Sequence, residues 1–77
     1  MRLTSKHIAL LKSLSEGKIL CAKFGGGTPN LQGYIDGERV CRERTWIALF
    51  KEDYIADIGN FKFGITDKGK IVLNETK

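Results

Sequence analysis

The stretch of residues 39–69 constrains the fold most, because it places a short basic helix directly before two β-prone segments joined by a turn. The helical part, residues 42–52, is amphipathic when it is drawn on a wheel at about 100° per residue. One side carries Trp46, Leu49, Phe50 and Asp53, and the other carries Arg44, Ala48 and Lys51. We therefore expect the first side to pack and the second to stay free for binding.

A predicted hairpin follows this helix. Residues 55–58 form its first strand and residues 61–65 its second. The pair Gly59-Asn60 is expected to turn the chain between them, because it tolerates the positive φ of a two-residue turn.

The N-terminal segment is predicted to be a packing helix. Thr4 has the residue type and position of an N-cap, and the helix should run to about Ser15. Gly17 follows where a left-handed residue commonly ends a helix. Ile8, Leu10, Leu11 and Leu14 form the apolar arc of this helix.

Short extended segments occupy the middle of the chain. Predicted strands cover residues 18–24, 31–35 and 38–40. The first two should pair as a hairpin, and Asp36-Gly37 should make a tight turn before the third. For residues 66–73 two predictions stay open, a short helix capped at Thr66 or a strand.

These elements predict an α+β fold, a single domain over residues 1–77 with a winged-helix-like order. It has two to three short helices, a β-hairpin after the first helix and a C-terminal β-hairpin as the wing. The run Thr45-Trp46-Ile47-Ala48-Leu49-Phe50-Lys51 and the hairpin closing in Ile65-Thr66-Asp67-Lys68-Gly69 resemble small bacterial and phage winged-helix domains. More narrowly, the chain is similar to the YjhX-type winged-helix proteins of bacteria, although the loop of residues 25–30 is richer in glycine. The resemblance implies a fold more than a function.

Composition is that of a folded domain with a slight cationic excess. Of its 77 residues, 42% are apolar and 29% charged, and the net charge is +4. This charge suits an anionic partner, although many small proteins carry as much without one. The N-terminus lacks the uninterrupted apolar run of a signal peptide, and no segment is long enough to span a bilayer. A cytoplasmic protein is expected.

Cys21 and Cys41 lie twenty positions apart, without a CxxC pattern or a neighbouring histidine pair. This spacing argues against a zinc site. Free thiols are predicted, and a disulfide remains the alternative if the two segments pair.

The sequence predicts a protein that is not an enzyme and holds no cofactor or metal. His7 is the single histidine, and no nucleophile with a base can be assembled around it. The run Gly25-Gly26-Gly27-Thr28 lacks the following Lys-Ser/Thr and the helix of a phosphate-binding loop. A mobile hairpin tip is the better prediction for it.

Aromatic side chains are assigned mainly to the core, because so short a chain has few apolar groups to spare. Phe61 and Phe63 share one face of their strand, so both are expected to be buried while Lys62 points outward. Stacking on unpaired bases is the alternative for these rings. The full set is Trp46, Phe24, Tyr34, Phe61 and Phe63.

The candidate nucleic-acid-binding residues are Arg39, Arg42, Arg44, Lys51 and Lys62. Arg44 and Lys51 share the exposed helix face that would enter a major groove, and Lys62 lies on the wing. Arg39 and Arg42 precede or begin the helix, where they would reach phosphates. The alternative is a solvated basic face, since Glu43, Glu52 and Asp53 dilute its positive charge.

Two functions therefore remain open. The first is a transcriptional regulator that binds double-stranded DNA, and a homodimer fits this function because one small module buries little surface. The second is a protein-binding module, a small inhibitor or adaptor that engages a host protein through an exposed hairpin edge or the glycine-rich tip. The acidic residues of the helix favour the second, and its basic face favours the first.

Overall fold

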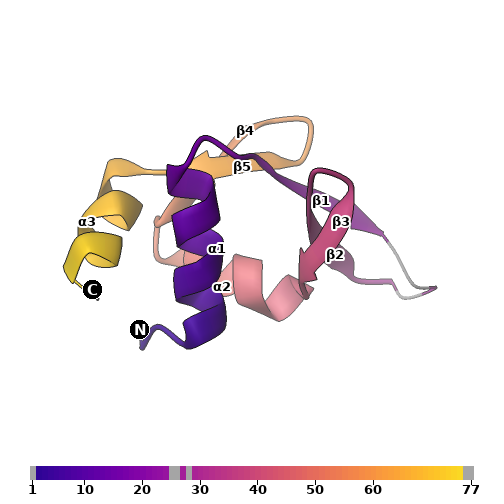
Figure 1. Ribbon diagram of the computed structural model, residues 1–77. Helices are drawn as coiled ribbons and strands as arrows, with labels where there is room; N and C mark the ends of the chain where they lie inside the picture. The colour runs from indigo at the N-terminus through magenta and orange to yellow at the C-terminus, as the bar shows by residue number, and fades with distance from the viewer. Residues whose placement is uncertain (1, 25–26, 28, 76–77) are drawn as a thin grey trace.

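The computed structural model describes residues 2–24, 27 and 29–75, and it confirms the α+β class. Within these residues the chain forms three helices and a five-stranded antiparallel sheet (Figure 1). The elements are α1 (Ser5–Ser15), β1 (Leu20–Phe24), β2 (Leu31–Ile35), β3 (Glu38–Cys41), α2 (Glu43–Lys51), β4 (Ile55–Gly59), β5 (Lys62–Ile65) and α3 (Asp67–Glu75). Residues 25, 26 and 28 of the glycine-rich loop, predicted as a mobile tip, lie outside the described part.

The sheet joins both predicted hairpins through β1. Its strand order is β3-β2-β1-β5-β4, so β1 pairs with β2 on one side and with β5 on the other. The C-terminal hairpin is consequently part of a larger sheet, in which β5 is an inner strand and β4 an edge. The sequence predicts two hairpins, and this long-range pairing joins them into one sheet of five strands.

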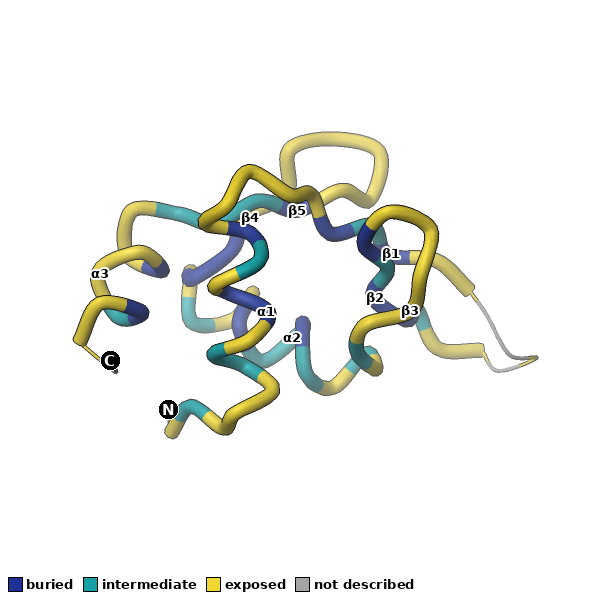
Figure 2. The backbone as a smooth tube through the Cα atoms, in the orientation of Figure 1, coloured by how far each residue is buried: buried dark blue, intermediate teal, exposed yellow. Residues whose placement is uncertain are grey.

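The core lies between the helices and one face of the sheet (Figure 2). Leu11, Leu20, Leu49 and Ile55 are its fully buried large side chains. Trp46 packs against Phe63 with ring centroids 4.9 Å apart. Its indole Nε1 donates a hydrogen bond of 2.8 Å to the carbonyl of Leu31, which satisfies the polar end of a buried ring.

The prediction of buried aromatic rings is confirmed for Trp46 and Phe63, which are 6% and 5% exposed. It is wrong for Phe24 and Phe61, which are 70% and 63% exposed. Phe24 ends β1, where the strand runs away from the helices in Figure 1. Phe50, expected on the packing side of its helix, is exposed in part, and its ring meets that of Phe63 edge-on with centroids 5.5 Å apart. Phe61 is exposed for a different reason, the position of the hairpin turn.

The turn of the C-terminal hairpin lies one residue later than predicted. Asn60 and Phe61 are its two central residues, with φ of 51° and 59°, and Gly59 pairs with Lys62. An irregularity of β4 between Asp57 and Gly59 shifts the register. Phe61 therefore belongs to the turn, and the strand alternation that buries Phe63 does not extend to it.

A threonine directly precedes both α1 and α3. Thr4 and His7 form a reciprocal cap of α1, in which Thr4 N–H donates to His7 Nδ1 over 3.1 Å and His7 N–H donates to Thr4 Oγ1 over 3.4 Å. The Thr4 cap is as predicted, and the part played by His7 is new. At α3, Thr66 Oγ1 accepts a hydrogen bond of 3.0 Å from Gly69 N–H. Of the two predictions for residues 66–73, a helix capped at Thr66 or a strand, the helix is therefore confirmed.

The cap of α1 predicts a stability that depends on pH. Burial lowers the pKa of His7 below 6.5, so the unfolded chain binds the proton more readily than the folded one. The stabilisation is complete above about pH 6.5 and is lost as the pH falls through the folded pKa. Thermal unfolding should therefore occur at a lower temperature at about pH 5.5 than at about pH 7.5.

The variant His7→Gln is the matched control, because glutamine at this position also accepts from the N-cap backbone and does not titrate. Its unfolding temperature should change less between the two pH values than that of the wild type. An equal change in both proteins would contradict the role of His7.

A second prediction concerns Gly69, which is buried in α3. A Cβ there would overlap the carbonyl oxygen of Tyr54 and lie 2.8 Å from Ile65 Cγ1. Gly69→Ala should lower the free energy of unfolding by about 1 to 3 kcal/mol, although alanine normally favours a helix by about 1 kcal/mol. Gly64→Ala is the control, since its nearest neighbour, Ile58, lies 3.8 Å away. Urea unfolding of both variants measures the difference, and a Gly69→Ala protein as stable as the wild type would contradict the contact.

Candidate functional site

One face of the sheet is left uncovered by the helices. Leu20 and Ala22 of β1 are buried in the core. Because successive side chains of a strand alternate between the two faces, Cys21 and Lys23 point to the opposite face. Lys23 is exposed and Cys21 is half-buried. We call this side, with the outward residues of all five strands, the open face.

A row of paired residues crosses the open face. Lys62 of β5 lies opposite Cys21 of β1, Cys21 lies opposite Tyr34 of β2, and Tyr34 lies opposite Arg39 of β3. Directly paired residues of antiparallel strands project to the same side of a sheet. Next to the row, Lys23 Nζ lies 5.7 Å from the centre of the Tyr34 ring. The open face thus combines an aromatic ring with cations from three strands.

A groove of about 600 Å³ runs into one end of this face. Its lining consists of Gly17, Lys18, Ile19, Cys21, Asp36, Gly37, Ile58 and Lys62. Ile19 and Ile58 give it an exposed apolar part. Lys18 Nζ lies 3.8 Å from Asp36 Oδ2, so the carboxylate at this rim is paired. Asp36 and Gly37 have φ of 53° and 82°, as expected for the predicted tight turn.

The second candidate surface is the exposed side of α2. Arg44 and Lys51 are both exposed there, and Ala48 between them is half-buried. Arg42 is the N-cap residue, and its side chain makes no cap hydrogen bond. The predicted division of the helix into a packing side and a free side therefore agrees with the burial of Trp46 and Leu49.

The acidic residue at the start of α2 has a structural role that the sequence did not indicate. Glu43 Oε2 accepts a hydrogen bond of 2.7 Å from the backbone N–H of Leu31. Trp46 donates to the carbonyl of the same Leu31, so α2 holds both backbone groups of this strand residue. Glu43 is turned toward the sheet, and its charge dilutes the exposed basic side less than its position in the sequence suggests.

The five predicted nucleic-acid-binding residues divide between these two surfaces. Arg42, Arg44 and Lys51 belong to α2 and its cap, whereas Arg39 and Lys62 belong to the open face. In Figure 1 α2 lies at the bottom of the molecule and the β4–β5 hairpin at the top. Lys62 is exposed on the hairpin, and Arg39 lies within β3, paired with Tyr34.

The two cysteines are free thiols on opposite faces of the sheet. They are separated by β2, because Cys21 pairs with Tyr34 and Cys41 with Gly33. Burial raises the pKa of Cys41 to about 11, although backbone hydrogen bonds from Gly33 and Trp46 oppose the shift. This arrangement agrees with the predicted free thiols and leaves the alternative disulfide without a suitable geometry.

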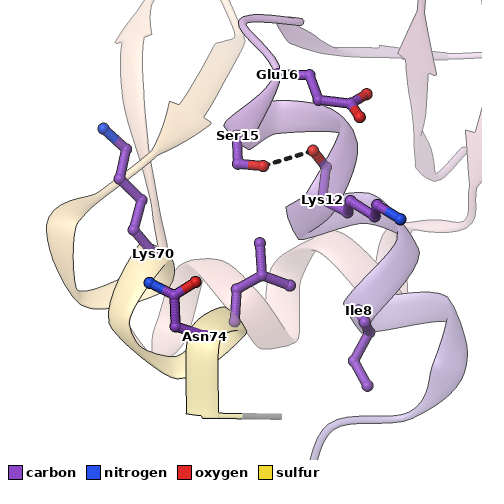
Figure 3. A pocket seen from close by; sticks show the side chains of 7 residues that line it. Ile8, Lys12, Ser15, Glu16, Lys70 and Asn74 are labelled. Carbon is purple, nitrogen blue, oxygen red and sulfur yellow. Dashed lines mark hydrogen bonds between the residues drawn. The ribbon is translucent and has the colours of Figure 1, made fainter. Parts of the chain in front are cut away.

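A second groove, of about 580 Å³, separates α1 from α3 (Figure 3). Ile8 and Leu73 contribute apolar surface, and Lys12 and Lys70 contribute the cations. Ser15 Oγ donates to the Lys12 carbonyl over 2.7 Å, so this hydroxyl is already engaged within α1. The described residues contain no group of three potential metal ligands, and none of their helices has the length and apolarity needed to cross a membrane.

Comparison of the chain with protein-family models, with curated proteins and with solved structures finds no match. The resemblance to YjhX-type winged-helix proteins accordingly stays a prediction. The candidate sites of the chain are the open face and the exposed side of α2.

The opposed cysteines predict selective alkylation. At about pH 8 only about one thousandth of Cys41 is thiolate, because its pKa is about 11. N-ethylmaleimide should modify Cys21 first in the folded protein and both residues in denaturant, as mass spectrometry of the peptides would show. Cys21→Ser is the control and should resist the reagent while folded. Equal native rates at the two thiols would contradict the assigned faces.

Proposed function

We propose that the chain is a small DNA-binding regulator of the winged-helix type, with α2 as the helix that enters the major groove. The order of elements supports this proposal, because β5 lies between β1 and β4. The hairpin that follows α2 is thereby attached to the strand that follows α1, as in a winged helix. The β2–β3 hairpin precedes α2 and extends the sheet on its other side.

The observation that carries the proposal is the charge of the exposed side of α2. Arg44 and Lys51 are separated by seven positions, which corresponds to about 10 Å along a helix. This span fits within a major groove about 12 Å wide, where cationic side chains contact guanine edges or the flanking phosphates. Glu43 does not oppose them there, since its carboxylate is bonded to Leu31 N–H.

The protein-binding alternative has one observation in its favour. Strands β3 and β4 are the edges of the sheet, and Val40 and Ile58 on them are exposed apolar residues. An exposed edge accepts an added strand from a partner, with apolar side chains providing the contact. A protein that fails to bind duplex DNA should be searched for such a partner.

Charge reversal on α2 tests the proposal. Arg44→Glu combined with Lys51→Glu should abolish binding to duplex DNA, measured by fluorescence anisotropy at low salt. In each single variant, where binding is weakened but still measurable, loss of a phosphate-binding cation should reduce the slope of log affinity against log salt by about one. Both side chains are exposed, so each change should alter the free energy of unfolding by no more than about 0.5 kcal/mol.

The matched control is Lys12→Glu combined with Lys70→Glu, which changes the net charge equally at the groove between α1 and α3. Duplex binding should survive in this variant apart from a general weakening. A wild-type protein that does not bind duplex DNA at low salt would rule out the regulator. Equal weakening of duplex binding in the two double variants would show that only net charge matters and that α2 is not the binding helix.

A further inference from the structure

We propose that the open face of the sheet binds single-stranded nucleic acid, at a site separate from the exposed side of α2. The row that crosses four strands carries this inference, with Lys62 at one end, Arg39 at the other and Tyr34 between them. At about 4.8 Å between strands the row is about 14 Å long. It is long enough for about four stacked nucleotides at about 3.4 Å each.

The charges of the open face complement a phosphate backbone. Lys23, Arg39 and Lys62 are exposed, and they come from three different strands. The carboxylates on the neighbouring strand positions project to the other face, because Glu38 pairs with Ile35 and Asp57 pairs with Phe63, both of which are buried in the core. Asp36, at the rim of the groove, is paired with Lys18. The positive charge of the row is therefore largely uncompensated on its own face.

The aromatic and apolar groups favour a single strand over a duplex. Tyr34 is only half-buried, and the cation that covers its ring, Lys23 Nζ, is at the end of a flexible side chain. An arriving base can take the place of this ammonium on the ring while the ammonium turns to a phosphate. Ile19 and Ile58 in the groove provide further apolar contact for bases. A duplex hides the faces of its bases and cannot use these groups.

Cys21 provides a probe at the centre of the row, because it is paired with Lys62 on one side and with Tyr34 on the other. A strand bound along the row should cover its thiol. The test on the wild-type protein measures the rate at which N-ethylmaleimide alkylates Cys21, with and without a saturating oligothymidylate of about 12 nucleotides. The oligothymidylate should slow the reaction. If it binds without slowing the alkylation, the site lies elsewhere and the proposal is wrong.

Three variants identify the groups involved through anisotropy of the labelled oligothymidylate. Tyr34→Leu should weaken binding about 5- to 150-fold, which is the contribution of one stacked base, whereas Tyr34→Phe should retain it. Lys23→Glu with Lys62→Glu should abolish it. Thermal unfolding shows whether each variant is folded, and the alkylation test needs no variant at all.

The α2 double variant separates this proposal from the proposed function. Arg44→Glu with Lys51→Glu should lose duplex DNA and keep the oligothymidylate, so either activity can fail alone. No binding of oligothymidylate to the wild type at low salt would overturn the inference. Equal protection of Cys21 by an acidic polypeptide would also overturn it, because such a ligand matches the charge and has no bases to stack.

Discussion

The pairing of β1 on both of its edges is the constraint on which the rest of the structure depends. Without the pairing of Leu20 and Cys21 with β5, the strands would form two separate sheets, β1-β2-β3 and β4-β5. The backbone N–H of Ala22 continues this contact beyond the strand, since it donates to the Phe61 carbonyl over 2.8 Å. The carbonyl of a turn residue thus joins the tip of the β4–β5 hairpin to β1, the central strand of the sheet.

The double pairing also determines which side chains lie on the open face. Residues of a strand alternate between two faces, so the burial of Leu20 and Ala22 commits Cys21 and Lys23 to the open face. Because neighbouring strands are in register with β1, the same choice places Tyr34 and Lys62 there. Core formation and the position of the cations are therefore consequences of one register. A shift of β1 by a single residue would exchange the two faces.

Local signals in the sequence were sufficient for most elements. Thr4, the Asp36-Gly37 turn and the amphipathic spacing of α2 each act over a few residues, and all three elements occur as predicted. The β1–β5 pairing joins distant residues, and no local pattern indicates it. The exposure of Phe61 depends on a register irregularity in β4, which the alternation of residue types in β5 does not reveal.

The candidate site was likewise predictable in composition but not in arrangement. Sequence reasoning predicted Arg39 as a phosphate contact next to α2 and Lys62 as a contact on the wing, whereas the register puts both in one row on the open face. It missed Lys23, whose contact with Tyr34 exists because the two lie on adjacent strands and becomes visible only when the strand pairing is known.

The size of the domain explains why both candidate surfaces are open rather than enclosed. A chain of 77 residues needs most of its large apolar side chains for one small core, and little remains to build the walls of a deep pocket. Long cationic side chains make good binding groups on such a scaffold, because their exposed charges cost the core nothing and reach beyond the backbone. The helix α2 and the open face lie on opposite sides of the β-sheet, so a ligand on one leaves the other accessible. Under the two proposals, a duplex bound to α2 would therefore leave the open face accessible to an unpaired strand.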